Sequence, residues 1–486
     1  MTTPALQDDA GHLVVPCMIN GKHVIQPSHA SFPVVSARTQ EALHYGQTST
    51  VEMAVKAVES SDATFKVYKK TLVDERRQLL LRAADIFEKR SDEAMHRQIT
   101  ETSCEEPWAR FNVVATVRAV REAAHAARAA LTGNLPPSTS GVPLLVQKEP
   151  VGPVLMIVPW NGALILGARG IASALAAGCT VVFKASELCP WTHSFLVETF
   201  LEAGFPAGSV NFIMSDRAAA AQVTEAVIAH PALRKVEFIG SAPVGRAIGV
   251  TAAKHLKPII MELGDQSPAI VLEDANLAKA ATLCATGAQM LHGQVCFGTE
   301  RVIVHSSIKD KFCSLLADAF RNNPVSGSAI TMAFANKAQQ VVDDAVKRGA
   351  KLIYGDNKLV GASVGPTILT DIDPESLISK NEAFAPTLFV VAVDNDEEAI
   401  GEANSREGGL SASIFTSNYE RGLRIASELE FGQVQLNQST LNADALGPLA
   451  GWKGSGWGSH AGRYGIELFL QHRAIFLFPS EGANPH

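Results

Sequence analysis

A cysteine and a glutamate stand in surroundings that suit covalent catalysis through sulfur. Cys296 follows Gly293-Gln294-Val295, and a glycine at that point lets the backbone approach a substrate closely. Glu262 ends the apolar run 258–261, where a carboxylate partly withdrawn from water can serve as a general base. Both residues also have an ordinary interpretation, because most single cysteines are inert and a glutamate at a strand end is usually solvated. They are therefore candidates for a nucleophile and its base, with structural roles left open.

Asn161 is a third candidate, and its position suggests an interaction with a carbonyl oxygen. It follows Val158-Pro159-Trp160, directly after an apolar run that predicts a buried strand. Ligands of a doubly wound sheet bind at the carboxyl ends of its strands, where an Asn amide can donate two hydrogens to a developing oxyanion. The alternative is a turn residue that caps the following helix.

Two further motifs fit the parts of a nucleotide. Lys184 and Glu187 follow another apolar run and could bracket the hydroxyls of a ribose, or form a solvated charge pair at a helix start, with Ser186 and Glu187 as caps. Gly240-Ser241 lies between a predicted strand and a predicted helix, whose N-terminus would attract a pyrophosphate. The motif is neither the dinucleotide-binding G-x-G-x-x-G nor a P-loop, so alone it is a weak signal.

Short β-rich runs alternate with helical patterns, which is typical of α/β domains with doubly wound parallel sheets. Strands are expected at 155–158, 180–183, 210–213 and 235–239, and in a second set at 269–272, 300–304, 387–393 and 411–415. Helices are expected at 190–203 and 218–229, and throughout the long region 51–124. Residues 133–142, rich in Gly, Pro and Ser, predict two short strands around a turn, as a projecting arm.

Composition narrows the class of protein. The 486 residues are 47% hydrophobic, which excludes general disorder. They carry 42 Lys+Arg against 49 Asp+Glu, a net charge of −7, which argues against a nucleic-acid partner. Seven cysteines do not make a disulfide scaffold, and residues 1–16 show no secretory signal, so we expect a soluble, cytoplasmic protein. Segment 162–183 has one charge, Arg169, and is expected to be a buried helix and strand rather than a membrane span. We expect no bound metal.

In order and spacing the motifs resemble the aldehyde dehydrogenase superfamily, from Ile19-Asn20-Gly21-Lys22 to Arg473. The stretches 108–112 and 184–190 look most like the salicylaldehyde and vanillin dehydrogenase branch. The resemblance implies two doubly wound α/β domains and a small β oligomerisation arm, in a homodimer or homotetramer. The implied boundaries are 1–127 and 150–263 for the coenzyme domain, 264–455 for the catalytic domain, and 128–149 and 466–486 for the arm.

The resemblance also implies a role for each motif. Cys296 would be the nucleophile, Glu262 the general base and Asn161 the oxyanion donor. The residues that would hold the cofactor are Trp160, Lys184, Glu187, Gly240, Ser241, Gly264, Glu382 and Phe384. The residues that would line the aldehyde pocket are Trp108, Phe111, Leu166, Val295 and Phe297. NAD would be preferred and NADP possible, because Glu187 would repel a 2′-phosphate.

These assignments predict NAD(P)-dependent oxidation of an aldehyde, aromatic or otherwise apolar, to the carboxylic acid. The aldehyde would add to Cys296 as a thiohemiacetal and become a thioester, released by water that Glu262 activates rather than by coenzyme A. One alternative is a divergent, non-catalytic member with a binding or assembly role. Another is an esterase or acyltransferase that dispenses with the nicotinamide.

Several positions depart from the family pattern. A usual proline and three usual glycines are replaced here by Ala163, Asp265, Ala385 and Ala450. Asp265 adds a carboxylate near the site, which could activate the water in place of Glu262. A proton relay that some relatives build from a Lys and a Glu is expected to be missing, because Gly170 and His460 occupy those places.

Overall fold

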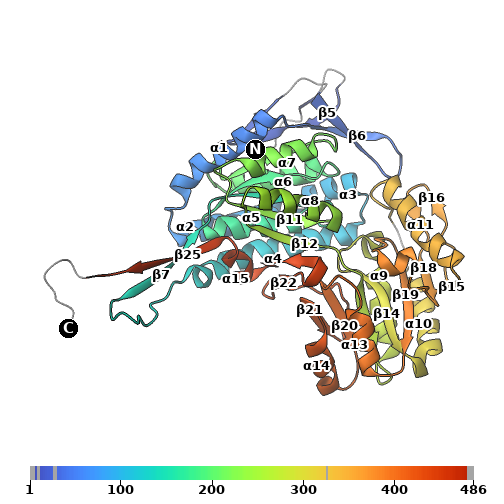
Figure 1. Cartoon of the computed structure of the whole chain (residues 1–486). Coiled ribbons are helices and arrows are strands. Elements are labelled where there is room, and N and C mark those ends of the chain that lie inside the picture. Colours follow the sequence, from blue (N-terminus) through green and yellow to red (C-terminus); the bar gives the residue numbers. More distant parts are fainter. Residues whose placement is uncertain (1–5, 8–10, 26–29, 324–326, 479–486) are drawn as a thin grey trace.

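The computed structural model of the chain describes residues 6–7, 11–25, 30–323 and 327–478. Two large, mostly parallel sheets with flanking helices form the body, and a two-stranded arm projects from it (Figure 1). The predicted fold class, two α/β units with a small β arm, is confirmed.

The first large sheet has eight strands in the order β23-β12-β11-β8-β9-β10-β3-β4. Its strands are β3 (Cys17–Ile19), β4 (Lys22–Val24), β8 (Pro153–Ile157), β9 (Thr180–Lys184), β10 (Val210–Ile213), β11 (Lys235–Gly240), β12 (Ile259–Leu263) and β23 (Gly456–Trp457). The five central strands are parallel, whereas β3 and β23 join them antiparallel. Because helices cover both faces, the central strands are mostly apolar, with Glu237 inside β11 as an exception.

A series of helices within the described residues packs around this sheet. They are α1 (Val51–Tyr68), α2 (Val73–Lys89), α3 (Ser91–Thr102), α4 (Glu106–Leu131), α5 (Ile165–Ala177), α6 (Pro190–Glu202), α7 (Ala220–Ala229) and α8 (Ala242–Lys254). Helix α5 is buried from Leu166 to Ala177 and packs on α4, β8 and β9, as expected for a helix of small residues inside the body. Within the described ranges, none of the helices is both long and apolar enough to cross a membrane.

The second large sheet has seven strands in the order β15-β18-β19-β14-β13-β20-β21. Its strands are β13 (Ser267–Val271), β14 (Thr299–His305), β15 (Lys351–Tyr354), β18 (Thr367–Thr370), β19 (Thr387–Val393), β20 (Ser411–Phe415) and β21 (Gln433–Leu436). Its helices are α9 (Leu277–Gln289), α10 (Lys309–Asn322), α11 (Met332–Lys347), α12 (Leu377–Lys380), α13 (Asp396–Asn404) and α14 (Tyr419–Glu428). Three predicted strands, those at 210–213, 387–393 and 411–415, match β10, β19 and β20 residue for residue.

Smaller elements complete the body. A four-stranded sheet contains β1 (Leu6–Gln7), β2 (Leu13–Val15), β5 (Ser31–Val35) and β6 (Ala42–Gln47). Two short pairs are β16 (Leu359–Val360) with β17 (Ser363–Val364), and β22 (Leu449–Ala450) with β24 (Ser459–His460). Helix α15 (Gly462–Glu467) follows β24 and packs on α4 and α5, so the C-terminal segment returns to the first sheet.

The arm does not contain the local hairpin expected at 133–142. Strand β7 (Leu144–Pro150) pairs along its whole length with β25 (Leu470–Phe476), far away in sequence. The two strands predicted within 133–142 are wrong, because only Asn134 makes an isolated bridge there, to Val146. Pro136-Pro137 removes two backbone donors from that stretch, which prevents a regular hairpin.

Candidate active site

Predicted site residues gather at one edge of the eight-stranded sheet. Parallel pairing places Ile157 beside Lys184 across β8 and β9, and Ile239 beside Glu262 across β11 and β12. Asn161 follows β8 by a few residues. Because parallel strands end at the same edge, residues from distant parts of the chain share the place where such sheets bind ligands.

The loop that carries Cys296 reaches this edge from the other half of the body. Before it, three successive residues are left-handed and turn the chain sharply, namely Leu291 (φ 50°), His292 (φ 57°) and Gly293 (φ 75°). A Cβ on Gly293 would overlap the carbonyl group of Ala385, so only glycine fits there. The sequence predicted that the backbone here approaches a substrate closely. In the structure Gly293 instead packs closely against Ala385, which fixes the Cys296 loop against residues 382–386.

Cys296 keeps partial exposure, whereas the other six cysteines are buried. Burial raises the pKa of its thiol well above the ordinary 9.0, and the carboxylates of Glu262 and Glu382 raise it further, while Arg169 lowers it. The sulfur is therefore protonated at neutral pH before ligands bind, and it needs a base to become a nucleophile.

Asn161 is held against the Cys296 loop. Its Nδ2 donates to the backbone oxygen of Gln294 at 3.0 Å, and its backbone oxygen accepts from Nε1 of Trp108 at 2.9 Å. The alternative that Asn161 caps the next helix is wrong, because the N-cap of α5 is Leu164. One amide hydrogen is used for Gln294, and the second remains for a ligand close to the nucleophile.

Glu262 is deeply buried and paired. Its carboxylate is 1% exposed, and Oε2 lies 3.0 Å from Nη2 of Arg169 and 3.3 Å from Nε2 of His460. The alternative of a solvated glutamate at a strand end is therefore wrong. Glu262 also lies near enough to Cys296 to act on the pKa of its thiol, so a candidate base and a candidate nucleophile share one site.

Arg169 and His460 were not assigned to this site from the sequence. The signal for Arg169 was present, since a single charge inside a buried helix requires a counter-charge. For His460 the only sequence signal was the resemblance, which placed it where some relatives carry a relay residue; it reaches Glu262 from the short strand β24.

Asp265 does not take part in this cluster. Its Oδ2 accepts hydrogen bonds from the backbone N–H groups of Leu410, at 2.9 Å, and Ser411, at 3.4 Å, at the start of β20. Burial raises its pKa, although those backbone donors and Arg301 oppose the shift. The suggestion that Asp265 replaces Glu262 as base is not supported, because its carboxylate is used to join two parts of the second sheet.

Lys184 and Glu187 lie at and just after the carboxyl end of β9. Lys184 is buried at the end of β9, and burial lowers its pKa while Glu187 opposes that change. Glu187 is partly exposed. The alternative that Ser186 and Glu187 cap helix α6 is wrong, because the carboxylate of Glu101 accepts the first backbone N–H groups of that helix at 2.7 and 2.8 Å.

The N-terminus of α8 is open to a ligand. Ser241 is its N-cap and is exposed, and its hydroxyl accepts no hydrogen bond from the helix. A Cβ on Gly245 would lie 2.6 Å from Leu263, so glycine lets this helix pack closely on β12. The first turn of α8 has no side-chain cap, so its free backbone N–H groups, apart from that missing in Pro243, remain available to an anion.

Glu382 and Phe384 come from the second half of the body. Glu382 Oε1 is buried without a hydrogen-bond partner among the described residues, and a Cβ on Gly264 would lie 2.6 Å from that side chain. Burial raises the pKa of Glu382, as does Glu300. Glu300 in turn accepts the backbone N–H groups of Ala383 and Phe384, each at 2.9 Å, and burial raises its pKa to about 7.

Trp160, Phe334 and Phe384 form a group of three aromatic rings. Trp160 lies edge-on to Phe334 at 6.0 Å and to Phe384 at 6.2 Å between ring centroids. Phe384 adopts φ 51°, an uncommon conformation that the hydrogen bonds to Glu300 hold. Phe334, at the start of α11, was not foreseen, because nothing in the sequence links that helix to Trp160.

Most of the predicted aldehyde-lining residues form one apolar cluster with Trp160. Trp108, Val295 and the partly buried Phe297 belong to it, and Phe111 contacts Trp108 at 5.4 Å between ring centroids. Leu166 is buried in a neighbouring cluster instead, although it lies beside Gly162. The cluster adjoins both Asn161 and the Cys296 loop through Trp108 and Val295.

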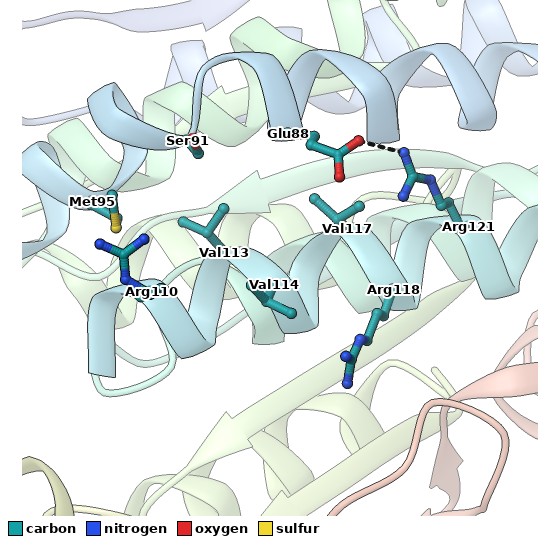
Figure 2. A pocket seen from close by; sticks show the side chains of 9 residues that line it. All are labelled: Glu88, Ser91, Met95, Arg110, Val113, Val114, Val117, Arg118 and Arg121. Atoms are coloured by element: carbon teal, nitrogen blue, oxygen red, sulfur yellow. Dashed lines mark hydrogen bonds and ion pairs between the residues drawn. The ribbon is translucent and has the colours of Figure 1, made fainter. Parts of the chain in front are cut away.

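A separate groove lies on α2, α3 and α4. Figure 2 shows it, with Val113 and Val117 between Arg110 and Arg121, and Arg121 paired with Glu88 at 2.7 Å. No residue predicted for the site lines it. Within the described ranges, no group of three or more His, Cys, Asp or Glu side chains could hold a metal ion.

Comparisons with known proteins agree with this geometry. A model of the aldehyde dehydrogenase family matches residues 24–475. A vanillin dehydrogenase of Pseudomonas sp. (strain HR199 / DSM 7063) is 37% identical over 472 residues, which cover 95% of this chain and 98% of that protein. A salicylaldehyde dehydrogenase of Pseudomonas sp. (strain C18) is 32% identical over 96% of this chain and 99% of its own length. The crystal structure of a salicylaldehyde dehydrogenase from Pseudomonas putida G7, complexed with salicylaldehyde, matches with a TM-score of 0.93 and 32% identity, covering 98% of this chain and 100% of that one.

Iodoacetamide should alkylate Cys296 before any other thiol of the folded protein, because the other six are buried. The labelling rate should still rise as the pH increases through 9.0, since only the thiolate reacts and its fraction is small below the raised pKa. Peptide mass spectrometry after short exposures at several pH values measures both effects. In the control Cys296→Ala the fast label should disappear, and equally fast labelling of Cys104 or Cys189 would contradict the described packing.

Proposed function

The chain belongs to the aldehyde dehydrogenase family, as its motifs predicted, and we propose that it oxidises an aromatic aldehyde with NAD and releases the acid by hydrolysis. Oxidation of an aldehyde follows from family membership, and nothing found favours a non-catalytic role. The observation that carries the hydrolytic proposal is the buried carboxylate of Glu262 beside Cys296. A base at that place suits attack of water on a thioester.

The reaction begins at Cys296. Its Sγ bonds to the aldehyde carbon while Glu262 accepts the thiol proton, which the raised pKa keeps on the sulfur at rest. The second amide hydrogen of Asn161 and the backbone N–H of Cys296 stabilise the oxyanion. When bound, NAD supplies an oxidised ring that accepts a hydride, so that the adduct becomes a thioester. After Glu262 loses its first proton, it takes another from water, which attacks the thioester and frees the acid and the Cys296 thiolate.

The residues present fit a nicotinamide dinucleotide. Ser241 and the open N-terminus of α8 would hold the pyrophosphate, and Lys184 with Glu187 would hold the adenosine ribose. The partnerless oxygen of Glu382 would accept a hydroxyl of the second ribose. Phe384 would pack near the nicotinamide ring.

The substrate proposal rests on the cluster that contains Trp108, Val295 and Phe297. Aromatic walls next to an oxyanion donor favour a flat, apolar aldehyde. The names of the similar proteins, vanillin and salicylaldehyde dehydrogenases, support the same class.

Assembly and compartment are proposed on separate grounds. The strands β7 and β25 form a two-stranded arm whose outer positions are exposed, including Phe476 at 53%. Such an isolated pair is marginal alone, so pairing with another subunit in a homodimer or homotetramer would stabilise it.

Seven unpaired thiols suit a reducing compartment such as the cytoplasm.

A panel of aldehydes should separate substrate classes. Benzaldehyde and its hydroxy and methoxy derivatives should give higher kcat/KM than short linear aldehydes or succinate semialdehyde, because the cluster around Trp108 is apolar and aromatic. NADH absorbance measures the rate, and chromatography with and without coenzyme A shows whether the free acid is the product. A semialdehyde used as well as the aromatic compounds would contradict the substrate proposal.

Glu262→Gln should allow one slow turnover and then stop. A burst of about one NADH per site is expected, followed by a steady rate lowered ~10²–10⁴-fold, because the thioester no longer has a base to activate water. Stopped-flow absorbance measures both phases. Glu407→Gln, at an exposed carboxylate, is the control and should change neither phase. An unchanged steady rate in Glu262→Gln would show that another group activates the water.

Glu187 should favour NAD over NADP. A 2′-phosphate would bring about −1.5 to −2 charges against its carboxylate, whereas Lys184 offsets part of the repulsion, so preference rather than exclusion is expected. Glu187→Gln should narrow the difference mainly by tightening NADP binding, as measured by KM for each cofactor. A wild-type preference for NADP of about tenfold in kcat/KM would contradict this role.

A further inference from the structure

Behind Glu262, two more titratable groups continue in a line into the protein. His460 lies between two carboxylates, with Nε2 at 3.3 Å from Oε2 of Glu262 and Nδ1 at 3.1 Å from Oε1 of Glu237. Glu237 is fully buried and His460 is 5% exposed. Each ring nitrogen therefore lies within ion-pair distance of a different carboxylate, although neither contact has the geometry of a hydrogen bond.

Glu237 has no evident structural partner other than His460. Neither of its oxygens makes a hydrogen bond of good geometry within the described residues. Its carboxylate lies against Gly170 of α5, where a Cβ would stand 2.9 and 3.0 Å from the two oxygens. A side chain at position 170 would displace Glu237, so the glycine makes room for this second carboxylate.

The charges around Glu262 favour a proton taken from the Cys296 thiol. Arg169 carries one positive charge, and the two carboxylates of Glu262 and Glu237 face it and His460. A proton that enters this buried group offsets the second carboxylate, so the group can hold it.

In the proposed reaction Glu262 accepts a proton twice in each turnover. It takes a proton from the thiol of Cys296 and later another from the hydrolytic water. The first proton must leave before the second can be accepted, yet Glu262 is 1% exposed and its Oε2 faces Arg169 and His460. Arg169 cannot accept a proton, because its guanidinium is already charged.

We propose that His460 and Glu237 form a proton path that unloads Glu262 between thioester formation and hydrolysis. This inference rests on the proposed function, in which Glu262 is the base. Glu262 gives its proton to Nε2 of His460 while Nδ1 gives its proton to Glu237. Glu262 becomes a carboxylate again, the imidazole changes tautomer, and Glu237 becomes a carboxylic acid, so charge and protons balance. His460 and Glu237 act through Glu262 and are positioning residues rather than catalytic ones.

The path can continue toward solvent along β11. Lys235 precedes Glu237 by two residues, so both side chains leave the same face of the strand. Lys235 is partly exposed, senses the charge of Glu237, and donates from Nζ to the backbone oxygen of Leu468. The charged groups that face His460 are Glu262 on β12 and Glu237 on β11, with Arg169 of α5 bound to Glu262.

The test separates the first turnover from the later ones. In His460→Gln and Glu237→Gln, the NADH burst should keep its amplitude of about one per site, because Glu262 starts each first turnover unloaded. The steady rate should fall about tenfold or more, because the thioester waits for a free base. In His460→Ala, added imidazole should restore the steady rate, whereas thiazole, a ring of the same size without an N–H, should not.

His44→Ala is the matched control, since His44 forms another buried pair with a carboxylate, 2.9 Å from Glu101. Circular dichroism and thermal unfolding show that each variant is folded, and the control should keep the wild-type ratio of burst to steady rate. Unchanged steady rates in His460→Gln and Glu237→Gln would overturn the path, as would rescue by thiazole or no rescue at all. If the wild-type protein releases product only with coenzyme A, both the hydrolytic function and the proton path are overturned. If the wild-type protein hydrolyses the thioester and the two variants keep its steady rate, only the proton path is overturned.

Discussion

The buried carboxylate of Glu262 is the constraint on which the rest of the site depends. A carboxylate withdrawn from water is tolerated only with compensating charge and hydrogen-bond donors. Helix α5 supplies Arg169 and the C-terminal segment supplies His460, so three distant stretches of chain must meet at the end of β12. Two short strand pairs, β23 with β12 and β22 with β24, bring the last part of the chain to Glu262.

A second constraint acts through the backbone rather than through charge. Gly293 fits against Ala385 without room for a side chain, and Glu300 holds the N–H groups of Ala383 and Phe384. The nucleophile loop and the segment that bears Glu382 are thereby joined as one unit. Positioning of this kind suits chemistry in which sulfur, carbonyl and cofactor must be aligned within a fraction of an ångström.

Much of the fold and the choice of candidate residues were predictable from the sequence, because they depend on local patterns. Buried parallel strands are continuous apolar runs, and polar residues directly after them mark a ligand-binding edge, which is how Asn161, Lys184 and Glu262 were found. What failed depends on contacts between distant segments. The cap of α6 is Glu101 rather than a neighbour in sequence, and β7 pairs with β25 rather than with a local hairpin partner. The sequence did not indicate the contact of His460 with Glu237 either, because no local pattern connects these two residues.

The late arrival of β23 at the edge of the first sheet has a consequence for biosynthesis. Strands β8 to β12 are made early and are mostly local in their pairing, so they can associate while the rest of the chain is still being synthesised. Until residues 456–457 emerge, β12 is an open edge strand with apolar side chains, a template for pairing with a neighbouring nascent chain. Glu262, near the end of that strand, carries charge at this exposed edge strand, and charge there opposes pairing between copies. The carboxylate that is difficult to bury in the finished protein thus helps to protect its half-made sheet from aggregation.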